Sequence, residues 1–332
     1  MAKIVLGLGT SHTPMLLASD ETLLRFEETD QNIKHRDKEG RPTSYSELLE
    51  KADPKMAAMT QPAEIVARQN KARAAIAHVS KTLNDARLDT LIVMGDDQDE
   101  SYLEDCRPTF AIYYGDTILN SNEQHEQYRE RYPEWYVKNR QGFFEDNAPR
   151  PYPVDSKLAL HLIDWLMEHG FDPASSKSLR KGEGEGHAVA YVHRRVMDDK
   201  KPVPVVPVFL NTYFAPNQPR PRRCYELGLA IRKAVEAYPG DARIGIVGSG
   251  GLSHFLVDEE FDRAILKACA DKDAEFLQNL PRNKLHAGSS EILNWIGIAA
   301  ACEHLDLNWF EYVPGYRTAA GTGTGLSFAS WA

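Results

Sequence analysis

Three histidines of this chain stand in short turns rich in glycine, serine or threonine. The turns are Gly9-Thr-Ser-His12-Thr-Pro14, Gly186-His187-Ala188 and Ser249-Gly-Gly-Leu-Ser-His254. Neutral imidazole binds metal ions and transfers protons near neutral pH. One such turn could hold an incidental histidine, but three of them predict that His12, His187 and His254 converge on one cleft. The other eight of the 11 histidines fall on predicted helices or polar loops, and we interpret them as solvent-facing or structural.

Carboxylates gather at the end of one predicted strand. The apolar run Leu88–Gly95 is typical of a buried strand, and Asp96-Asp-Gln-Asp-Glu100 follows it directly. A solvated turn would explain this composition. Carboxylate and amide oxygens that converge at a strand end also suit a hard cation. Both interpretations are open from the sequence.

Apolar strands alternate with amphipathic helices along the chain. Strands are predicted near Lys3–Gly9, Leu88–Gly95, Pro108–Tyr114, Val203–Leu210 and Arg243–Val247, and helices at Pro62–Arg87, Ser156–His169, Arg222–Tyr238, Glu259–Gln278 and Ser289–His304. This alternation predicts an α/β fold with helices layered around a central mixed β-sheet. We expect a single catalytic domain, residues 1–332, without internal repeats. Residues 121–150 are predicted to form a surface helix and loop, Gly182–Ala188 a flexible loop, and Ala319–Gly325 another loop.

A polar segment of about residues 20–61 interrupts this pattern. It contains charged runs, a turn at Gly40-Arg-Pro42 and a short predicted helix at Tyr45–Lys51. Long connections inside a compact domain are commonly functional or disordered. We interpret the segment as an insertion that forms a lid over a cleft.

Composition and charge exclude several classes of protein. Of the 332 residues, 42% are apolar and 26% charged, which is ordinary for a globular protein, and the net charge of −9 argues against binding to nucleic acid or an anionic membrane. No signal-peptide pattern and no apolar run of transmembrane length is seen. The four cysteines form no CxxC pair, so neither a zinc finger nor a disulfide framework is indicated. We therefore expect a cytoplasmic protein.

Several short motifs resemble one known family in both order and spacing. They are Gly9–Pro14, Leu91–Asp97, Pro108–Ile112, Gly186–Ala188, Pro204–Tyr213, Arg223–Gly228, Ser249–His254 and Glu291–Trp295. The chain resembles the catalytic subunits of class III extradiol ring-cleavage dioxygenases, of the protocatechuate 4,5-dioxygenase and gallate dioxygenase type. The resemblance covers most of the chain except residues 20–85 and 117–150.

The resemblance implies a non-haem Fe(II) enzyme that cleaves a substituted catechol next to its diol with O2. Protocatechuate, gallate and methylgallate are the kind of small aromatic substrate implied. By resemblance, His12 and Glu291 are metal ligands, His254 is the base and acid that handles the substrate hydroxyl proton, and His187 is a second polar histidine near the substrate. A carboxylate that faces inward from an apolar helix, as Glu291 would, suits a metal. We also expect a homo-oligomer.

The chain departs from the family at the second histidine ligand. Relatives carry it in an Asp-His pair after the strand that here ends at Gly95, and this chain has Asp97-Gln98. Gln98 could ligate weakly, Asp97 could turn inward, or another side chain could enter. The first two would give an oxygen-rich site for Fe(II) or Mn(II). A metal-free site with changed chemistry is a further possibility.

A carboxylated substrate would need a cation or amides. The loop Asn211–Gln218, with Asn211 and Thr212, and the arginines Arg220, Arg222 and Arg223 are the candidates for substrate binding.

Two rival functions follow from the Asp97-Gln98 change. The chain could be a metal-dependent hydrolase or isomerase on the same fold that does not use O2, or a binding protein without activity. The presence of His12, His187, His254 and Glu291 argues against the binding protein, since a dead site has no physical need for four such groups.

Overall fold

A computed structural model describes residues 1–121, 132–146, 148–180 and 184–332 of the chain. Within these residues, one mixed sheet runs in the order β11-β13-β1-β10-β4-β9-β5-β8, and β12 pairs with β13. The parallel centre consists of β1 (Lys3–Thr10), β10 (Arg243–Ser249), β4 (Thr90–Asp96) and β9 (Val205–Leu210). At one edge, β5 (Phe110–Tyr113) runs antiparallel to β9, and β8 (Ala174–Ser176) runs parallel to β5.

The C-terminal strands complete the other side of the sheet. β13 (Thr322–Trp331) runs antiparallel to β1, and both β12 (Leu307–Tyr316) and β11 (His254–Leu256) run antiparallel to β13. The predicted α/β fold with a mixed sheet is confirmed, and the five predicted strands share this sheet. The loop predicted at Ala319–Gly325 is wrong from Thr322 onward, because these residues already belong to β13.

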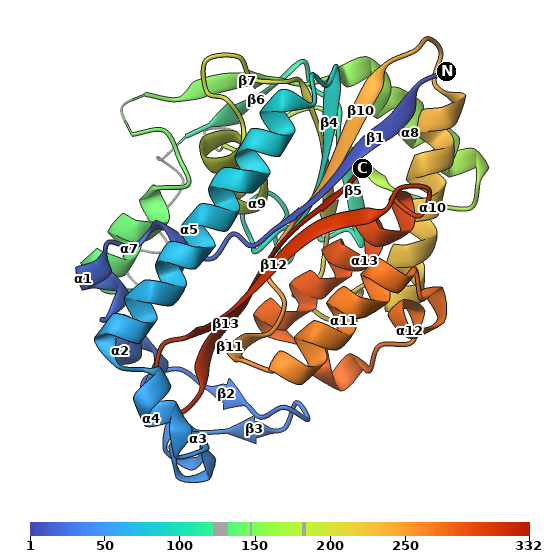
Figure 1. Ribbon diagram of the computed structural model, residues 1–332. Coiled ribbons are helices and arrows are strands. Elements are labelled where there is room, and N and C mark those ends of the chain that lie inside the picture. The colour runs from blue at the N-terminus through green and yellow to red at the C-terminus, as the bar shows by residue number, and fades with distance from the viewer. Residues whose placement is uncertain (122–131, 147, 181–183) are drawn as a thin grey trace.

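Helices cover both faces of the sheet (Figure 1). One face carries the long helix α5 (Pro62–Asp85), with α9 (His187–Tyr191), the π-helical turn Val192–Val196 and α7 (Glu134–Gln141). The opposite face carries α8 (Ser156–Glu168), α10 (Pro221–Ala237), α11 (Glu259–Asp271), α12 (Ala274–Gln278) and α13 (Ile292–Ala301). Strand β4 serves both layers, since Ile92 and Met94 pack into one cluster and Leu91 and Val93 into the other.

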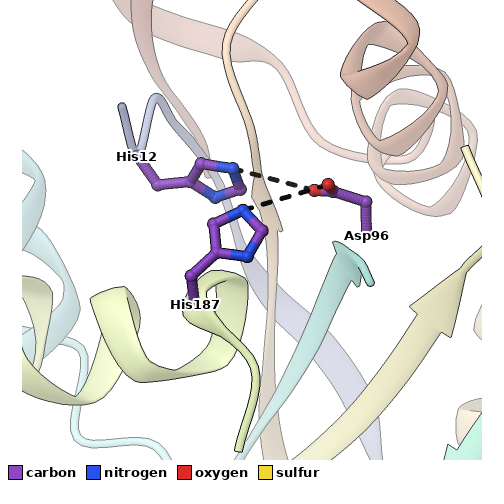
Figure 2. Close-up of side chains that lie close together, drawn as sticks. All are labelled: His12, Asp96 and His187. Atoms are coloured by element: carbon purple, nitrogen blue, oxygen red, sulfur yellow. Dashed lines mark ion pairs between the residues drawn. The ribbon is translucent and has the colours of Figure 1, made fainter. Parts of the chain in front are cut away.

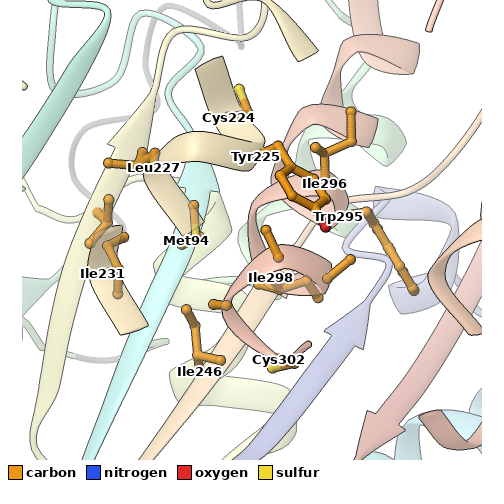
Figure 3. Close-up of a cluster of buried hydrophobic side chains, with 14 of the residues drawn as sticks. Met94, Cys224, Tyr225, Leu227, Ile231, Ile246, Trp295, Ile296, Ile298 and Cys302 are labelled. Carbon is orange, nitrogen blue, oxygen red and sulfur yellow. The ribbon is translucent and has the colours of Figure 1, made fainter. Parts of the chain in front are cut away.

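The face with α10 and α13 shows how closely the layers approach (Figure 3). Met94 and Ile246 of the sheet pack against Ile298 of α13, and all three are fully buried. Between the two helices there is room only for glycine. A Cβ at Gly228 would overlap the carbonyl oxygen of Gly297 and lie 2.9 Å from the Cβ of Ala300.

We therefore expect Gly228→Ala to lower the melting temperature. Overpacking costs about 1–3 kcal/mol, and the better helix propensity of alanine returns about 1 kcal/mol of that. Lys233→Ala, an exposed change in the same helix, is the control. Thermal unfolding followed by circular dichroism measures both variants. A Gly228→Ala protein as stable as the control would mean that α10 and α13 do not approach this closely.

The inserted segment, residues 20–61, is folded, and its strands lie beside β11 of the sheet (Figure 1). It comprises α1 (Asp20–Leu23), α2 (Phe26–Asp30), the hairpin β2 (His35–Arg36) and β3 (Pro42–Thr43), α3 (Tyr45–Lys51) and α4 (Lys55–Met59). The helix predicted at Tyr45–Lys51 is confirmed. Met56 packs on Val257 and Tyr316 of the main body. The lid role of the segment and the single-domain assignment both stay predictions.

Two regions of the sequence prediction need comment. The surface helix predicted within residues 121–150 corresponds to α7, but Trp135 and Val137 of that helix are buried. The antiparallel strands β6 (Thr117–Asn120) and β7 (Arg150–Pro153) precede and follow it in the chain. Residues 122–131 and 147, and residues 181–183 of the predicted Gly182–Ala188 loop, lie outside the described residues. Among the described helices, none combines the length and apolar character needed to span a membrane.

Candidate active site

The parallel strands deliver side chains to a common edge of the sheet. Thr10 pairs with Ser249, and Ser249 with Gly95, so β1, β10 and β4 end side by side. His12 lies just past β1, and Asp96 is the last residue of β4. The carboxyl ends of parallel strands are where open α/β sheets bind ligands. His12 and Asp96 point toward each other there, with His187 beside them (Figure 2).

Three further elements bring the remaining groups to this edge. His187 begins α9, His254 begins β11, and Glu291 ends the 3-10 turn Ala287–Glu291 that leads into α13. The glycines after β10 are required by this approach. Gly250 has φ 153°, and a Cβ there would lie 2.8 Å from the Cβ of Glu291.

The polar atoms of these residues lie close together. Nε2 of His12 is 3.7 Å from Oδ1 of Asp96 and 3.4 Å from Oε2 of Glu291. Nε2 of His187 is 3.9 Å from Oδ2 of Asp96, and Nε2 of His254 is 3.4 Å from Oε2 of Glu291. The structure thus brings His12, His187, His254 and Glu291 around one cavity, and the carboxylate of Asp96 lies next to His12 and His187.

Each of the three histidines has its tautomer set by a partner on Nδ1. Ser249 donates its hydroxyl proton to the carbonyl of Ala188, so its oxygen accepts from Nδ1–H of His12 at 2.8 Å. The carboxylate of Glu100 accepts from Nδ1–H of His187 at 2.6 Å. The carbonyl of Leu252 can only accept, so Nδ1 of His254, 2.9 Å away, carries the proton. In the neutral imidazoles, every Nε2 therefore presents a lone pair to the cavity.

Two atoms of this cluster are buried without a hydrogen bond. Nε2 of His12 and Oδ1 of Asp96 have no hydrogen-bond partner among the residues that the structure describes. Burial, and the neighbouring Glu291 carboxylate, raise the pKa of Asp96. Buried polar groups without partners are unfavourable. A cation between these donors would satisfy them, and His12, Asp96 and His187 each offer an atom within 4.8 Å of the others.

Glu291 is held as a carboxylate. Burial alone would raise its pKa, but the positive charge of His254 and His12 when their imidazoles are protonated, together with the N–H of Gly251, outweighs burial and lowers the pKa to about 2. The N–H of Gly251 donates to Oε2 of Glu291 at 2.6 Å. A buried, ionised carboxylate beside two imidazoles is a suitable ligand for a divalent metal.

The sequence of the chain matches a known family. Residues 53–290 of the chain match the family described as the catalytic LigB subunit of aromatic ring-opening dioxygenase. The chain belongs to this family. The resemblance seen in the sequence is therefore confirmed at the level of the family.

Individual LigB relatives match over shorter stretches. Gallate dioxygenase of Pseudomonas putida is 46% identical over 113 residues, which are 33% of this chain and 32% of the relative. A 2,3-dihydroxyphenylpropionate/2,3-dihydroxicinnamic acid 1,2-dioxygenase of Comamonas testosteroni is 35% identical over 104 residues, 31% of each chain. The chain thus spans about a third of the length of these curated relatives.

Asp97 and Gln98, where the sequence resemblance leads us to expect an Asp-His pair, point in different directions. The carboxylate of Asp97 accepts the N–H groups of Glu100, Ser101 and Tyr102 and caps its own loop. Burial, with Glu100 nearby, raises the pKa of Asp97 to about 7. Gln98 lines the cavity, and its Nε2 donates to Oδ2 of Asp96 at 2.9 Å. A metal-ligand role for Gln98 stays a prediction.

Behind His187 lies a buried ion pair. Arg140 donates to Oε1 of Glu100 at 2.8 Å, while Oε2 of Glu100 accepts from the ring and the backbone N–H of His187. Burial alone would lower the pKa of His187, but the charge and hydrogen bond of Glu100 raise it. A carboxylate on the far nitrogen is the usual support of a metal-binding histidine.

Most of the predicted substrate-binding residues lie apart from this cluster, but Tyr213 of the predicted loop Asn211–Gln218 lines the cavity of the histidines. Asn211 uses its side chain within its own loop, on Phe214 and Asn217, and Thr212 is fully buried. Arg220 lines a different cavity, beside Arg282 and Leu293. Arg222 and Arg223 pair with Glu226 on the surface of α10. Among the described residues, neither Asn211 nor Thr212 nor any of these three arginines lines the cavity of the histidines.

Sequence reasoning missed several residues of that cavity. They are Phe26, Tyr136, Phe255 and Arg317. Phe255, next to His254, has φ +66°, a left-handed conformation that bulky residues rarely adopt and that is common at functional sites. The backbone angle marks this residue in the structure, but the sequence does not reveal it. A second cavity, of about 500 Å³, lies between the inserted segment and β11 and contains none of the histidines of the cluster.

Proposed function

We propose that this chain opens the ring of a substituted catechol with O2, as an extradiol dioxygenase that uses Fe(II). Membership of the LigB family and the names of the two relatives support this proposal. The observation that carries it is the convergence of three imidazole Nε2 atoms and two buried carboxylates on one cavity at the carboxyl edge of the sheet.

The residues that would hold the metal are His12, Asp96, His187 and Glu291. Two imidazoles and two carboxylates contain the two-histidine, one-carboxylate set of non-haem iron oxygenases. The unpartnered Nε2 of His12 and Oδ1 of Asp96 support the fit, because a bound cation would satisfy both. When bound, iron would supply the binding of the catechol oxygens and the electron transfer to O2. Mn(II) would fit the carboxylates of the same set.

His254 would handle the proton of the substrate. Its Nδ1 is protonated against Leu252, so Nε2 is free to accept a proton from a catechol hydroxyl and to return it later. The ring is confined between two glycines, since a Cβ at Gly251 would lie 2.6 Å from its Cε1 and a Cβ at Gly288 would lie 2.5 Å from its Cγ. This confinement orients the ring of the general base, and the carboxylate of Glu291 lies 3.4 Å from Nε2.

The experiment that tests the function uses protein purified without O2 and loaded with Fe(II). Catechol, protocatechuate and gallate are offered in turn, and O2 uptake is measured together with the absorbance of ring-opened product. One O2 consumed for each ring opened is the expected result. Turnover without O2 uptake would contradict the proposal and favour the metal-dependent hydrolase or isomerase. Parallel loading with Mn(II) identifies the metal that supports turnover.

A further inference from the structure

We infer that Arg317 selects catechols that carry a carboxylate, and that the inserted segment holds Arg317 in position through Asp30. The inference rests on the proposed function for the catechol part of the ligand. The recognition of an anionic substituent rests on contacts at the cavity wall, independent of the metal site.

Arg317 follows β12 and lines the cavity of the histidines. Its Nε donates to Oδ2 of Asp30 at 3.0 Å and its Nη2 to Oδ1 at 2.7 Å, and the two side chains are only 8% and 1% exposed. Nη1 makes no hydrogen bond to any residue that the structure describes. Asp30 thus fixes the Nε and Nη2 side of the guanidinium, and Nη1 remains to donate to an acceptor group of a ligand in the cavity.

Helix α2 of the inserted segment builds this arrangement. Phe26 and Asp30 stand four residues apart, so both point from one face of the helix. The ring of Phe26 lies 5.2 Å from the guanidinium of Arg317, and Thr322 donates its hydroxyl to Oδ2 of Asp30 at 2.6 Å. Stacking and the double hydrogen bond together hold Arg317 against the wall instead of letting it turn to solvent.

A second donor stands beside Arg317. Tyr136 lines the same cavity, its ring 5.7 Å from that of Phe26, and its hydroxyl makes no hydrogen bond within the described residues. Burial raises the pKa of Tyr136, so the hydroxyl keeps its proton and can donate it. The charges of Arg140, Arg317 and Asp30 act on the pKa of Tyr136, whereas those of Glu291 and Asp96 act on the pKa of Tyr213. The cavity therefore has a wall of hydrogen-bond donors, Arg317 and Tyr136, distinct from the metal donors.

We infer that a catechol bound at the metal donors would direct its substituent toward the wall formed by Arg317 and Tyr136. A carboxylate there could accept from Nη1 of Arg317 and from the hydroxyl of Tyr136. A purely structural ion pair would explain the contact of Arg317 with Asp30, but it would not require the open Nη1 or the unpartnered Tyr136 in the cavity. Hydrogen bonds to charged groups contribute about 1.5–3 kcal/mol, which corresponds to about a 10- to 100-fold preference.

The test measures binding separately from turnover. Metal-loaded full-length protein is titrated by calorimetry, without O2, with 3,4-dihydroxybenzoate and with uncharged 4-methylcatechol. We expect Arg317→Met to weaken binding of the carboxylate about 10- to 100-fold and to leave binding of 4-methylcatechol within about twofold. Arg25→Met is the matched control, because Arg25 also forks onto a carboxylate, Glu28, and stacks on an aromatic ring, Trp135, but lies outside the cavity.

Asp30→Asn tests the positioning role. An amide has one oxygen where the carboxylate has two, so it cannot accept from both Nε and Nη2 of Arg317, and binding of 3,4-dihydroxybenzoate should weaken relative to 4-methylcatechol. Equal losses for both ligands in Arg317→Met, a loss of the same size in Arg25→Met, or an unchanged ratio in Asp30→Asn would each overturn the inference. Selective binding without any ring opening would support the inference and refute the proposed function, and ring opening that ignores Arg317 would do the reverse.

Discussion

Replacement of His254 by alanine is expected to lower turnover by about 100- to 10,000-fold, the usual contribution of a general base. The structure gives the reason. Leu252 holds the proton on Nδ1, and Nε2 stands 3.4 Å from Oε2 of Glu291 at the cavity wall. No other imidazole of the cluster can take over, since those of His12 and His187 are directed to Asp96.

The same variant is expected to bind metal nearly as well as the unchanged protein, because His12, Asp96, His187 and Glu291 remain. Turnover is measured as O2 uptake, and metal affinity by anaerobic calorimetry with Fe(II). His161→Ala is the matched control: its imidazole also bonds a backbone carbonyl, that of Ala234, but lies on α8 away from the cavity. If His254→Ala instead releases the metal, His254 is a ligand and its role as a base is refuted.

Much of the fold could be predicted because its signals are local. The strand Leu88–Gly95 is a continuous apolar run, and the helix Pro62–Arg87 repeats apolar residues at helical spacing. Strand β13 lacked such a signal, because Thr322-Gly-Thr-Gly-Leu reads as a loop. Its glycines serve packing: a Cβ at Gly325 would overlap the carboxylate of Asp262. Nothing local reveals such a neighbour 63 positions earlier in the sequence.

The candidate site could likewise be predicted only in part from the sequence. His12, His187 and His254 could be proposed from their turns, and the acidic run after Gly95 already suggested a cation. Which carboxylate of that run turns inward depends on the loop that Asp97 caps, a tertiary detail. The pairing of Arg317 with Asp30 joins residues 287 positions apart, from an insertion and the end of β12, so only the fold reveals it.

The second large effect is expected from Asp96, the first residue of the acidic run Asp96–Glu100. Asp96→Asn is expected to weaken binding of Fe(II) by more than the roughly 10- to 100-fold that loss of an outer partner of a metal site costs. The carboxylate of Asp96 lies between His12 and His187, at 3.7 and 3.9 Å, and its Oδ1 has no hydrogen-bond partner among the described residues. An amide keeps the shape of this side chain but loses the charge that a cation requires.

Gln98→Ala is expected to weaken binding of Fe(II) by no more than about 10- to 100-fold. The amide nitrogen of Gln98 donates to Oδ2 of Asp96, so Gln98 acts on the metal through Asp96. Asp99→Asn is the control within the same run, since the Asp99 side chain is 41% exposed and pairs with Arg107. Calorimetric titration of Fe(II) into the three variants ranks them. If Gln98→Ala loses as much affinity as Asp96→Asn, the carbonyl of Gln98 is itself a ligand, and Gln98→His should then tighten binding by restoring a nitrogen donor. If Gln98→His leaves the affinity unchanged and Asp96→Asn abolishes binding, Gln98 lies outside the metal site and Asp96 supplies the ligand at the end of β4.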